Sequence, residues 1–356
     1  MPLRCGLVGV PGCGKTTIYN AVTSAGMSIF DGAESHRATV AVPDPRVARL
    51  VNLYHPPKIV RASVEIVDIP GLSHGSTAEG GRGARLLTHI KEADALIHVV
   101  RCFAAPERPP SPLHDVEAVD LELMVADSQT IERKIERLAK RVRVGDKDAV
   151  REATDCNRVL RGLHAGTPVR NQGLADAEQA SVADCHLMSQ KPVLYVASVG
   201  SPRDVEGDGV IALRERASAE RCEVIAVCGR DEADISELAP SDREPFLAEL
   251  GLEELSIDRL LHAAYRELGL VDFFTAGEKE VHVWTCRRGE KAPAAAGRIH
   301  SDMERGFIRL EVIAYADLVE CGSEAAAAKA GKRRLEGRDY EIQDGDVVVV
   351  RFSPPR

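Results

Sequence analysis

The sequence predicts an α/β fold: a doubly wound parallel sheet, interrupted by a helical hairpin and followed by a smaller α+β domain. Five short runs rich in aliphatic and β-branched residues lie in the first two-thirds of the chain, at residues 3–10, 64–69, 95–100, 193–198 and 222–227. Continuous apolar runs are typical of buried parallel strands, and helix-like segments such as 16–24 and 83–93 separate them. A helical repeat interrupts this alternation, and the composition changes again near Val271.

The interruption is predicted to be an antiparallel pair of helices between two strands of the sheet. Mostly apolar residues recur at spacings of three and four on both sides of the turn signal Gly145-Asp146. The first series is Met124, Ser128, Ile131, Ile135, Leu138 and Val142, and the second is Ala149, Ala153, Cys156, Leu160 and Leu163. Residues 131–170 contain eleven Lys/Arg against six Asp/Glu, a local net charge of +5. Two interpretations stay open: a structural coiled coil (a solvated prop) whose charges only face water, or a basic arm that docks to a partner.

The C-terminal part of the chain is predicted to form a separate small domain. Strand-like segments occur at 280–286, 306–313 and 346–352, with a helical segment at 323–332 and a turn signal at Asp344-Gly345-Asp346. The predicted organisation is therefore a sheet domain in two parts, the helical arm and the C-terminal domain. These parts are residues 1–120 and 190–272 for the sheet domain, 121–189 for the arm and 273–356 for the last domain.

Length and composition exclude several classes of protein. A chain of 356 residues with 44% hydrophobic and 28% charged residues is long enough for two or three domains. No apolar run approaches the ~18 residues that span a bilayer, and the first strand leads directly into a glycine loop. We therefore expect no membrane partner and no secretory signal. The nine cysteines form no CxxC pair, so we expect a cytoplasmic protein with reduced thiols and no zinc site. The net charge of −9 argues against DNA as a partner, and any anionic partner is expected to bind locally.

A phosphate-binding loop follows the first predicted strand. Residues 9–16 read Gly-Val-Pro-Gly-Cys-Gly-Lys-Thr and match G-x-x-x-x-G-K-[ST] between a strand and a helix. Glycines let backbone N–H groups curl around phosphate oxygens, and the helix N-terminus adds a favourable dipole. Lys15 is expected to reach the terminal phosphates, and the Thr16 hydroxyl is expected to ligate Mg²⁺. The expected nucleotide contacts are Gly9, Pro11, Gly12, Cys13, Gly14, Lys15, Thr16 and Thr17.

A second phosphate motif lies at the end of the strand predicted at 64–69. The segment is Asp68-Ile69-Pro70-Gly71. The Asp68 carboxylate can hold Mg²⁺ through a water molecule, and the N–H of Gly71, three residues later, can contact a γ-phosphate. This short motif is weak alone and strong at this distance after a phosphate loop. The next residue is Leu72, where Ras-like enzymes carry a water-orienting Gln. Hydrolysis is therefore expected to be slow, or to be organised by another group.

The base-recognition motif of guanine-specific NTPases is missing. These proteins normally carry Asn-Lys-x-Asp, whereas the corresponding strand here ends with Ala197-Ser198-Val199-Gly200-Ser201. Strong guanine preference therefore has no obvious source. Ser198 and Cys228, each at the end of a predicted strand, are the residues expected at the base end of the site.

Over nearly the whole chain, these motifs resemble the YchF-type P-loop NTPases, relatives of the Obg GTPases. The matching segments include CGLVGVPGCGKTT, PDPR at 43–46, VDIPGL, HVVRCF at 98–103 and FFTAGEKEVHVWT at 273–285. GFIRLEVIAY and GKRRLEGRDYEIQDGDV are close to the C-terminal region of that family. The resemblance implies a P-loop nucleotide domain, an inserted coiled coil and a C-terminal TGS domain with a ubiquitin-like β-grasp fold.

The resemblance also implies a function. Members of this family bind ATP with Mg²⁺ and hydrolyse it slowly, with GTP often a poorer ligand, and they associate with ribosomes in translation or stress responses. The large ribosomal subunit and its rRNA are therefore the implied partners. Lys15 and Leu72 fall on the implied catalytic positions, Thr16 and Asp68 on the metal positions, and Gly71 on a phosphate contact. Two alternatives stay open: a nucleotide-binding adaptor with negligible hydrolysis, and a GTP-binding translation factor.

The chain departs from the family pattern in three places. The Asn-x-x-Glu that contacts the base reads Ser198 and Ser201 here. The first switch segment, between residues 26 and 43, is short and leaves Ser35 and Thr39 as candidates for its threonine. The family's proposed catalytic histidine has no clean match. His114 lies nearby and has two interpretations, a catalytic residue or, the one we expect, a loop histidine.

Several other residues have two interpretations each. Cys13 is either a thiolate favoured by Lys15 and the helix terminus, whose oxidation would block nucleotide binding, or a small side chain that fits the loop. Trp284 and Tyr315 are expected in the core rather than as base-stacking platforms, and His74 is expected to be solvated rather than to contact a partner. A basic run either contacts RNA phosphates or is an ordinary helix end. It consists of Lys329, Lys332, Arg333 and Arg334.

Overall fold

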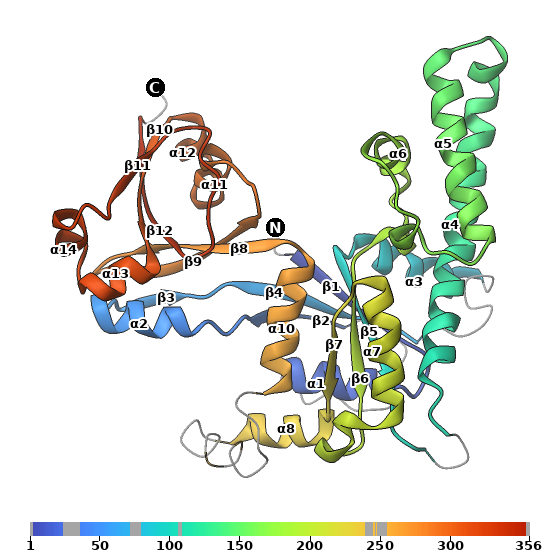
Figure 1. The fold of residues 1–356 in the computed structure, drawn as a ribbon, viewed down its shortest axis with the longest axis horizontal. Coiled ribbons are helices and arrows are strands. Elements are labelled where there is room, and N and C mark those ends of the chain that lie inside the picture. The colour runs from blue at the N-terminus through green and yellow to red at the C-terminus, as the bar shows by residue number, and fades with distance from the viewer. Residues whose placement is uncertain are drawn as a thin grey trace. The chain divides into compact units, whose positions relative to one another are not determined.

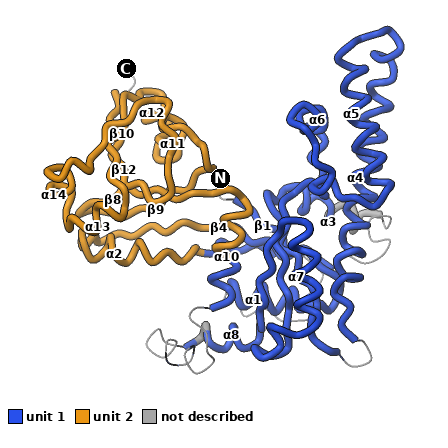
Figure 2. Tube along the Cα trace, in the orientation of Figure 1, with its two compact units in different colours: residues 1–40, 65–260 blue, residues 41–64, 261–356 orange. Residues whose placement is uncertain are grey.

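The structure, a computed structural model, describes residues 3–23, 36–71, 80–105, 109–238, 245, 247 and 255–353. The chain divides into two compact units, which Figure 2 shows in different colours. The first unit comprises residues 1–40 and 65–260, and the second comprises residues 41–64 and 261–356. Among the described residues, no helix combines the length and the apolar composition that a membrane span requires.

The first unit is built on a six-stranded sheet with the strand order β2-β4-β1-β5-β6-β7 (Figure 1). β5 pairs in parallel with β1 and with β6, and β6 pairs in parallel with β7. Every residue of β5 and of β6 is buried, which explains why these segments are continuous apolar runs. The predicted doubly wound α/β sheet is therefore confirmed. Its strands are β1 (Leu3–Val8), β2 (His36–Ala41), β4 (Ser63–Asp68), β5 (Ala95–Arg101), β6 (Val193–Ser198) and β7 (Val224–Val227).

Helices connect these strands and pack on the sheet. The long helix α4 (Pro112–Arg143) begins earlier than the predicted start of the arm at residue 121. The reason is that its first turns carry Val116, Val119 and Leu123, which are buried in the core of the sheet domain. The other helices around the sheet are α1 (Lys15–Thr23), α3 (Gly80–Glu92), α7 (Asp208–Glu220) and α8 (Gly229–Glu237).

The remainder of α4 and the helix α5 (Lys147–His164) form the predicted hairpin, which is confirmed (Figure 1). Gly145 makes the turn with a φ of +79°, and Asp146 caps α5 by accepting hydrogen bonds from Asp148 N and Ala149 N. The hairpin has an apolar core of its own, which continues into the 3-10 turn η1 (Val169–Asn171) and α6 (Asp176–Val182). This core contains Met124, Ile131, Cys156, Val159, Leu163, Val169 and Val182.

The second unit contains another six-stranded sheet, with the order β11-β10-β12-β8-β9-β3. One face is covered by α11 (Ala292–Ile299), whose Ala292, Ala295 and Ala296 bring the helix close to the sheet. The α+β character of the C-terminal region is therefore confirmed, while its assignment as a TGS domain stays a prediction. The strands are β3 (Lys58–Val60), β8 (Leu270–Ala276), β9 (Glu280–Arg287), β10 (Phe307–Ala314), β11 (Arg334–Glu336) and β12 (Asp346–Phe352), and the other helices are α2 (Pro45–Tyr54), α10 (Ser256–Glu267), α12 (Ser301–Arg305), α13 (Tyr315–Cys321) and α14 (Glu324–Lys329).

One segment differs from the predicted domain ranges. Residues 41–64, inside the range 1–120, carry α2 and β3 and belong to the second unit, where β3 pairs in parallel with β9. A three-residue strand needs a neighbouring sheet to be stable, and the sheet that receives it contains the C-terminal strands. The strands on either side of this segment, β2 and β4, pair in the sheet of the first unit. The other predicted boundaries stay predictions.

Candidate functional site

The predicted phosphate loop forms the turn between β1 and α1. The Val10 carbonyl accepts a hydrogen bond from Cys13 N at 3.2 Å, and the Gly14 carbonyl accepts one from Ile18 N at 3.0 Å as α1 begins. Gly12 and Gly14 have φ angles of +78° and +92°, which side-chain-bearing residues rarely adopt. The turn therefore depends on glycine at both positions, as the motif predicts.

Close approaches from neighbouring strands also require glycine in this loop. A Cβ at Gly9 would lie 2.5 Å from the carbonyl oxygen of Val99 in β5. A Cβ at Gly14 would lie 2.6 Å from the hydroxyl oxygen of Ser198 at the end of β6. The loop and the base-end serine are thus brought together, because the carboxyl ends of parallel strands meet at one edge of the sheet.

An ion pair joins the two phosphate motifs. Lys15 Nζ lies 2.5 Å from Asp68 Oδ1, and both side chains are only 9% exposed. Shielding from water makes such a pair electrostatically stronger than a surface pair. A Cβ at Gly71 would lie 3.1 Å from the backbone nitrogen of Pro11, so the chain after Asp68 runs against the phosphate loop. The residues predicted to hold the terminal phosphates and the metal are therefore neighbours.

The two threonines of the motif have different surroundings in the first turn of α1, where both are half-buried. The Thr17 methyl carbon would lie 3.2 Å from a Cβ at Gly229, so this side packs against the start of α8. Thr16 carries a hydroxyl and directly follows Lys15 in the chain. No group of three or more His, Cys, Asp or Glu side chains suitable for a metal occurs among the described residues. Mg²⁺ bound to phosphates needs only one or two protein oxygens, and Thr16 and Asp68 stay the residues predicted to supply them.

An aromatic residue that the sequence did not single out lies at the predicted base end of the site. Phe103 Cε1 lies 3.6 Å from a Cβ built at Gly14, and its own Cβ lies 3.3 Å from one built at Gly200. The ring is therefore next to the phosphate loop and next to the segment that follows Ser198. The available signal was its position two residues after the fully buried strand β5.

The other expected base-end residues mark the ends of β6 and β7. Ser198 is 5% exposed and pairs in register with Val227, so Ser198 and Cys228 lie at neighbouring strand ends. Burial raises the pKa of the Cys228 thiol. The backbone carbonyl of Cys228 accepts a hydrogen bond from Glu232 N where α8 begins. The Ser201 hydroxyl instead accepts a hydrogen bond from Arg203 N and caps a short 3-10 turn. Ser201 thus has a local structural role.

Cys13 is not an activated thiol. Its side chain is 1% exposed, and burial raises its pKa to about 11, with the Lys15 charge opposing this only in part. A Cβ at Gly9 would lie 2.7 Å from Cys13 Sγ, which shows how closely the sulfur fits the loop. The burial of the sulfur and its raised pKa both oppose the thiolate, so the structure favours the small side chain that fits the loop.

Some candidate residues fall outside the described part of the chain or outside the site. Leu72, His74 and Ser35 are not among the described residues. Thr39 lies in β2. His114 is exposed in the first turn of α4, so its interpretation as a loop residue is wrong, because the helix already begins at Pro112.

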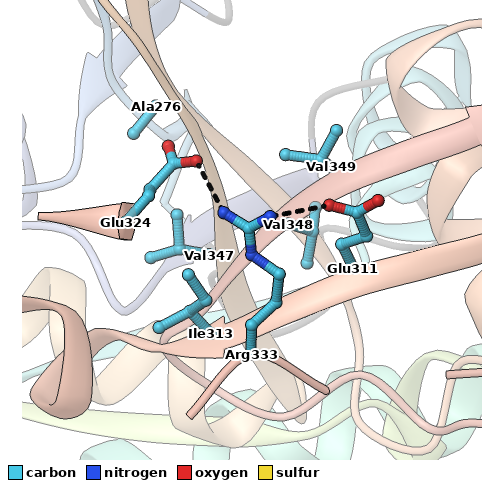
Figure 3. A pocket seen from close by; sticks show the side chains of 8 residues that line it. All are labelled: Ala276, Glu311, Ile313, Glu324, Arg333, Val347, Val348 and Val349. Atoms are coloured by element: carbon cyan, nitrogen blue, oxygen red, sulfur yellow. Dashed lines mark ion pairs between the residues drawn. The ribbon is translucent and has the colours of Figure 1, made fainter. Parts of the chain in front are cut away.

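The basic run of the C-terminal unit is largely engaged in ion pairs. Figure 3 shows Arg333 between Glu311 and Glu324, at 3.5 and 3.6 Å from their carboxylate oxygens. Cations that neutralise carboxylates of their own domain contribute little attraction for RNA phosphates. The structure therefore favours the interpretation as a helix end. The neighbouring pairs are Lys332 with Asp317 at 2.9 Å and Arg334 with Asp346 at 3.5 Å, while Lys329 ends α14.

The two aromatic residues considered as stacking platforms pack inside the C-terminal unit, as expected. Trp284 is half-buried at the edge of the core and stacks on His282, with ring centroids 3.6 Å apart. Tyr315 lies beside the ring of Phe274, at 6.4 Å between centroids.

Known proteins share these features over the full chain. A family model described as a 50S ribosome-binding GTPase matches residues 4–148. A model of the YchF GTPase C-terminal region, described as a protein of unknown function (DUF933), matches residues 270–353. The ribosome-binding ATPase YchF of Bacillus subtilis (strain 168) is 41% identical over 365 residues, which cover 99% of this chain and 100% of the relative. The protein of the same name from Escherichia coli O157:H7 is 38% identical, with 99% and 100% covered.

Solved structures agree with this relationship. The Schizosaccharomyces pombe YchF GTPase matches with a TM-score of 0.86 and 27% identity, over 98% of this chain and 97% of that chain. A GTP binding protein from Pyrococcus horikoshii OT3 matches with a TM-score of 0.59 and 17% identity, over 99% and 100%, and shows a shared fold alone. Full-length identity, the phosphate loop and the paired Lys15 and Asp68 lead to one conclusion: the chain belongs to the YchF family of P-loop nucleotide hydrolases.

Proposed function

We propose that this protein binds ATP with Mg²⁺, hydrolyses it slowly, and uses its nucleotide state to regulate association with the ribosome. The observation that carries the proposal is the convergence of Lys15, Asp68 and Ser198 on one glycine turn. The names of the curated relatives, ribosome-binding ATPases, support both the nucleotide and the partner. The description of the N-terminal family model supports the large ribosomal subunit as the docking site.

The phosphate end of the site supplies positive charge and backbone donors. The turn at residues 9–14 would present N–H groups to the phosphates, and the N-terminus of α1 adds its dipole. Lys15, now paired with Asp68, would exchange that partner for the terminal phosphates. Asp68 and the Thr16 hydroxyl would then hold Mg²⁺, which when bound neutralises charge that develops on the phosphate oxygens.

Slow hydrolysis follows from the residue after the second phosphate motif. Leu72 carries no group that can orient a water molecule. The same observation favours the second candidate, an adaptor that binds nucleotide without significant hydrolysis. Phosphate release by the wild type, by Lys15→Ala and by the exposed control Lys329→Ala, with and without ribosomes, separates the two. Release by wild type and control that exceeds release by Lys15→Ala supports the enzyme, whereas equal release by all three rejects it.

Base preference is expected to be modest. The Ser198 hydroxyl can donate or accept a hydrogen bond, so it discriminates poorly between adenine and guanine. The Phe103 ring offers an apolar face at the same end of the site. We therefore propose that ATP binds more tightly than GTP by less than about tenfold, a difference of about 1.4 kcal/mol. Parallel calorimetric titrations with both nucleotides test this, and a preference for GTP would point to the translation-GTPase alternative.

The tip of the helical arm is the proposed contact with rRNA. Lys140, Arg143 and Lys147 are exposed there, around Val144, which is 82% exposed. Phosphate contacts of this kind make the binding constant fall steeply with salt concentration. The slope of the logarithm of the binding constant against the logarithm of the salt concentration becomes steeper by about one unit per contact. Alanine at the three cations is expected to weaken ribosome co-sedimentation and to flatten its salt dependence by about two to three units, while Lys329→Ala leaves both unchanged. Unchanged sedimentation of the triple variant would leave the solvated-prop interpretation standing.

A further inference from the structure

We propose that Arg46 clamps the segment between β2 and β4 onto the C-terminal sheet, and that this clamp carries nucleotide-dependent changes at Asp68 into the second unit. The inference rests on the proposed nucleotide binding. It accounts for the PDPR motif at 43–46, for which the phosphate site has no use. We call Asp44, Arg46, Phe274 and Asp344 the Arg46 clamp.

The guanidinium of Arg46 is held on three sides. Asp44 caps α2 by accepting a hydrogen bond from Arg46 N at 2.8 Å, and both of its carboxylate oxygens lie 3.0 Å from Arg46 Nε. Arg46 Nη1 donates to Asp344 Oδ2 at 2.8 Å. The guanidinium carbon also lies 5.0 Å from the centre of the Phe274 ring. The clamp thus joins three segments that lie far apart in the sequence: PDPR, FFTAGE and the Asp344 turn.

Only arginine provides this combination of contacts. Its planar group donates to two carboxylates at once while its face lies over an aromatic ring, which the point charge of lysine cannot do. Arg46 is 23% exposed and Asp44 is 8% exposed at the side chain, so water screens the cluster only in part. The Asp344 carboxylate is fixed in turn, because it also accepts a hydrogen bond from Asp272 N at 3.0 Å.

Further contacts fasten the rest of the segment to the same unit. His262 Nε2 lies 2.6 Å from the Pro43 carbonyl oxygen, just before the clamp. The Tyr54 hydroxyl donates to Glu324 Oε1 at 2.8 Å at the end of α2. β3 then adds its backbone to β9. From residue 43 to residue 60 the segment is therefore attached to the second unit at several points, and β3 joins its sheet.

Both ends of this segment continue into strands of the phosphate sheet. β4 begins at Ser63 within the second unit and ends at Asp68, whose carboxylate pairs with Lys15. The four residue-to-residue steps from Val64 to Asp68 span only about 13 Å of extended chain, at about 3.3 Å per step. A short, hydrogen-bonded strand transmits displacement along its axis. When Asp68 changes partner on nucleotide binding, the clamp therefore moves with β4, and the C-terminal sheet responds.

The only tryptophan of the chain is placed to report this response. Trp284 lies in β9, the strand that pairs with β3, and it is half-buried with its Nε1 donating to Thr275 Oγ1 at 2.9 Å. We expect titration of the full chain with Mg²⁺ and a non-hydrolysable ATP analogue to change Trp284 emission. In Arg46→Ala this change should fall at least about threefold, while the affinity measured by calorimetry stays within about threefold.

A matched control separates the clamp from a general effect of losing an arginine. Arg351 lies in the same unit, is 54% exposed and pairs with Glu311 at 2.8 Å, so Arg351→Ala should keep the full response. Arg46→Lys keeps the charge without the planar fork and should give an intermediate response. If Arg46→Ala lacks a cooperative melt, Arg46→Lys and Asp344→Asn provide the test.

The outcomes distinguish this inference from the function on which it rests. A loss of response in the Arg46 variants, with retained affinity and a retained response in Arg351→Ala, supports the clamp. Binding of the analogue to the wild type without any change in Trp284 emission or in amide exchange of residues 41–64 and 270–287 overturns the clamp alone. A full response in a folded Arg46→Ala variant also overturns it. Absence of binding to the wild type overturns the proposed function together with the clamp.

Discussion

The Lys15–Asp68 pair gives the most direct test of the site. Both side chains are 9% exposed, and Nζ lies 2.5 Å from Oδ1. Removing one member leaves the other as a buried charge without its partner, which typically costs about 3–5 kcal/mol. We expect Lys15→Met and Asp68→Asn each to lower the free energy of unfolding by about 3 kcal/mol. The double variant should lose less than the sum, with a coupling of about 2 kcal/mol or more.

The probe of unfolding matters in this experiment. Trp284 lies in the second unit, so its fluorescence would follow the wrong part of the chain. Urea unfolding without nucleotide or Mg²⁺ should instead be followed by far-ultraviolet circular dichroism and by amide exchange in β1 and β4. A matched control is the exposed pair of Arg151 and Asp148, 3.4 Å apart and 69% and 81% exposed, whose cycle should show almost no coupling.

The refuting result is equally definite. If the losses of the two single variants add up in the double variant to within about 0.5 kcal/mol, the ammonium and the carboxylate do not stabilise each other. The two phosphate motifs would then not be joined energetically by this pair. Loss of nucleotide binding in Lys15→Met would not rescue it, because that result is expected from the phosphate contact alone.

Three further predictions concern single residues. Gly14→Ala should abolish detectable ATP binding in calorimetry and lower the melting temperature. The reason is that φ at this position is +92° and the new Cβ would lie 2.6 Å from Ser198 Oγ. Normal ATP binding by this variant would contradict the loop geometry. Cys13, 1% exposed and with its pKa raised by burial to about 11, should resist alkylation at neutral pH in mass spectrometry, whereas the partly exposed Cys321 reacts; equal labelling would show that the loop opens. Burial raises the pKa of Asp272 from 3.8 to about 6, so the folded protein keeps the carboxyl proton to higher pH than the unfolded chain does. The free energy of unfolding that this proton contributes is fully present below pH 3.8. It is lost as the pH rises through 6. Asp272→Asn should therefore gain stability relative to the wild type by up to about 3 kcal/mol between pH 4 and pH 7, and parallel melting curves across that range would refute the burial cost.

Much of the fold and the phosphate site could be predicted from local patterns. The continuous apolar runs identified β5 and β6 because both are buried on two faces. The glycines of the phosphate loop could be recognised because positive φ angles and close strand approaches exclude a side chain there. The three-four repeat on both sides of Gly145 identified the helical hairpin.

Local patterns could not show which charged groups pair over long distances. Lys15 was predicted as a phosphate ligand, yet its partner Asp68 is 53 positions away and becomes known only from the folded strands. The basic run after α14 had the composition of an RNA contact, but Arg333 lies between two carboxylates of its own domain. Phe103 ends the HVVRCF segment, but only the fold shows that it lies beside the phosphate loop, next to Gly14.

Sequence alone was enough for the glycine turn of the phosphate loop, the class of the sheet and the helical hairpin. Each of these depends on residues close together in the chain, where backbone sterics and periodic burial leave a local signature. Tertiary structure decided that residues 41–64 belong to the C-terminal sheet and that Arg46 reaches Asp344, 298 positions away. A short strand and a single arginine have no periodic pattern of their own, so only the fold selects the sheet and the carboxylate with which they pair.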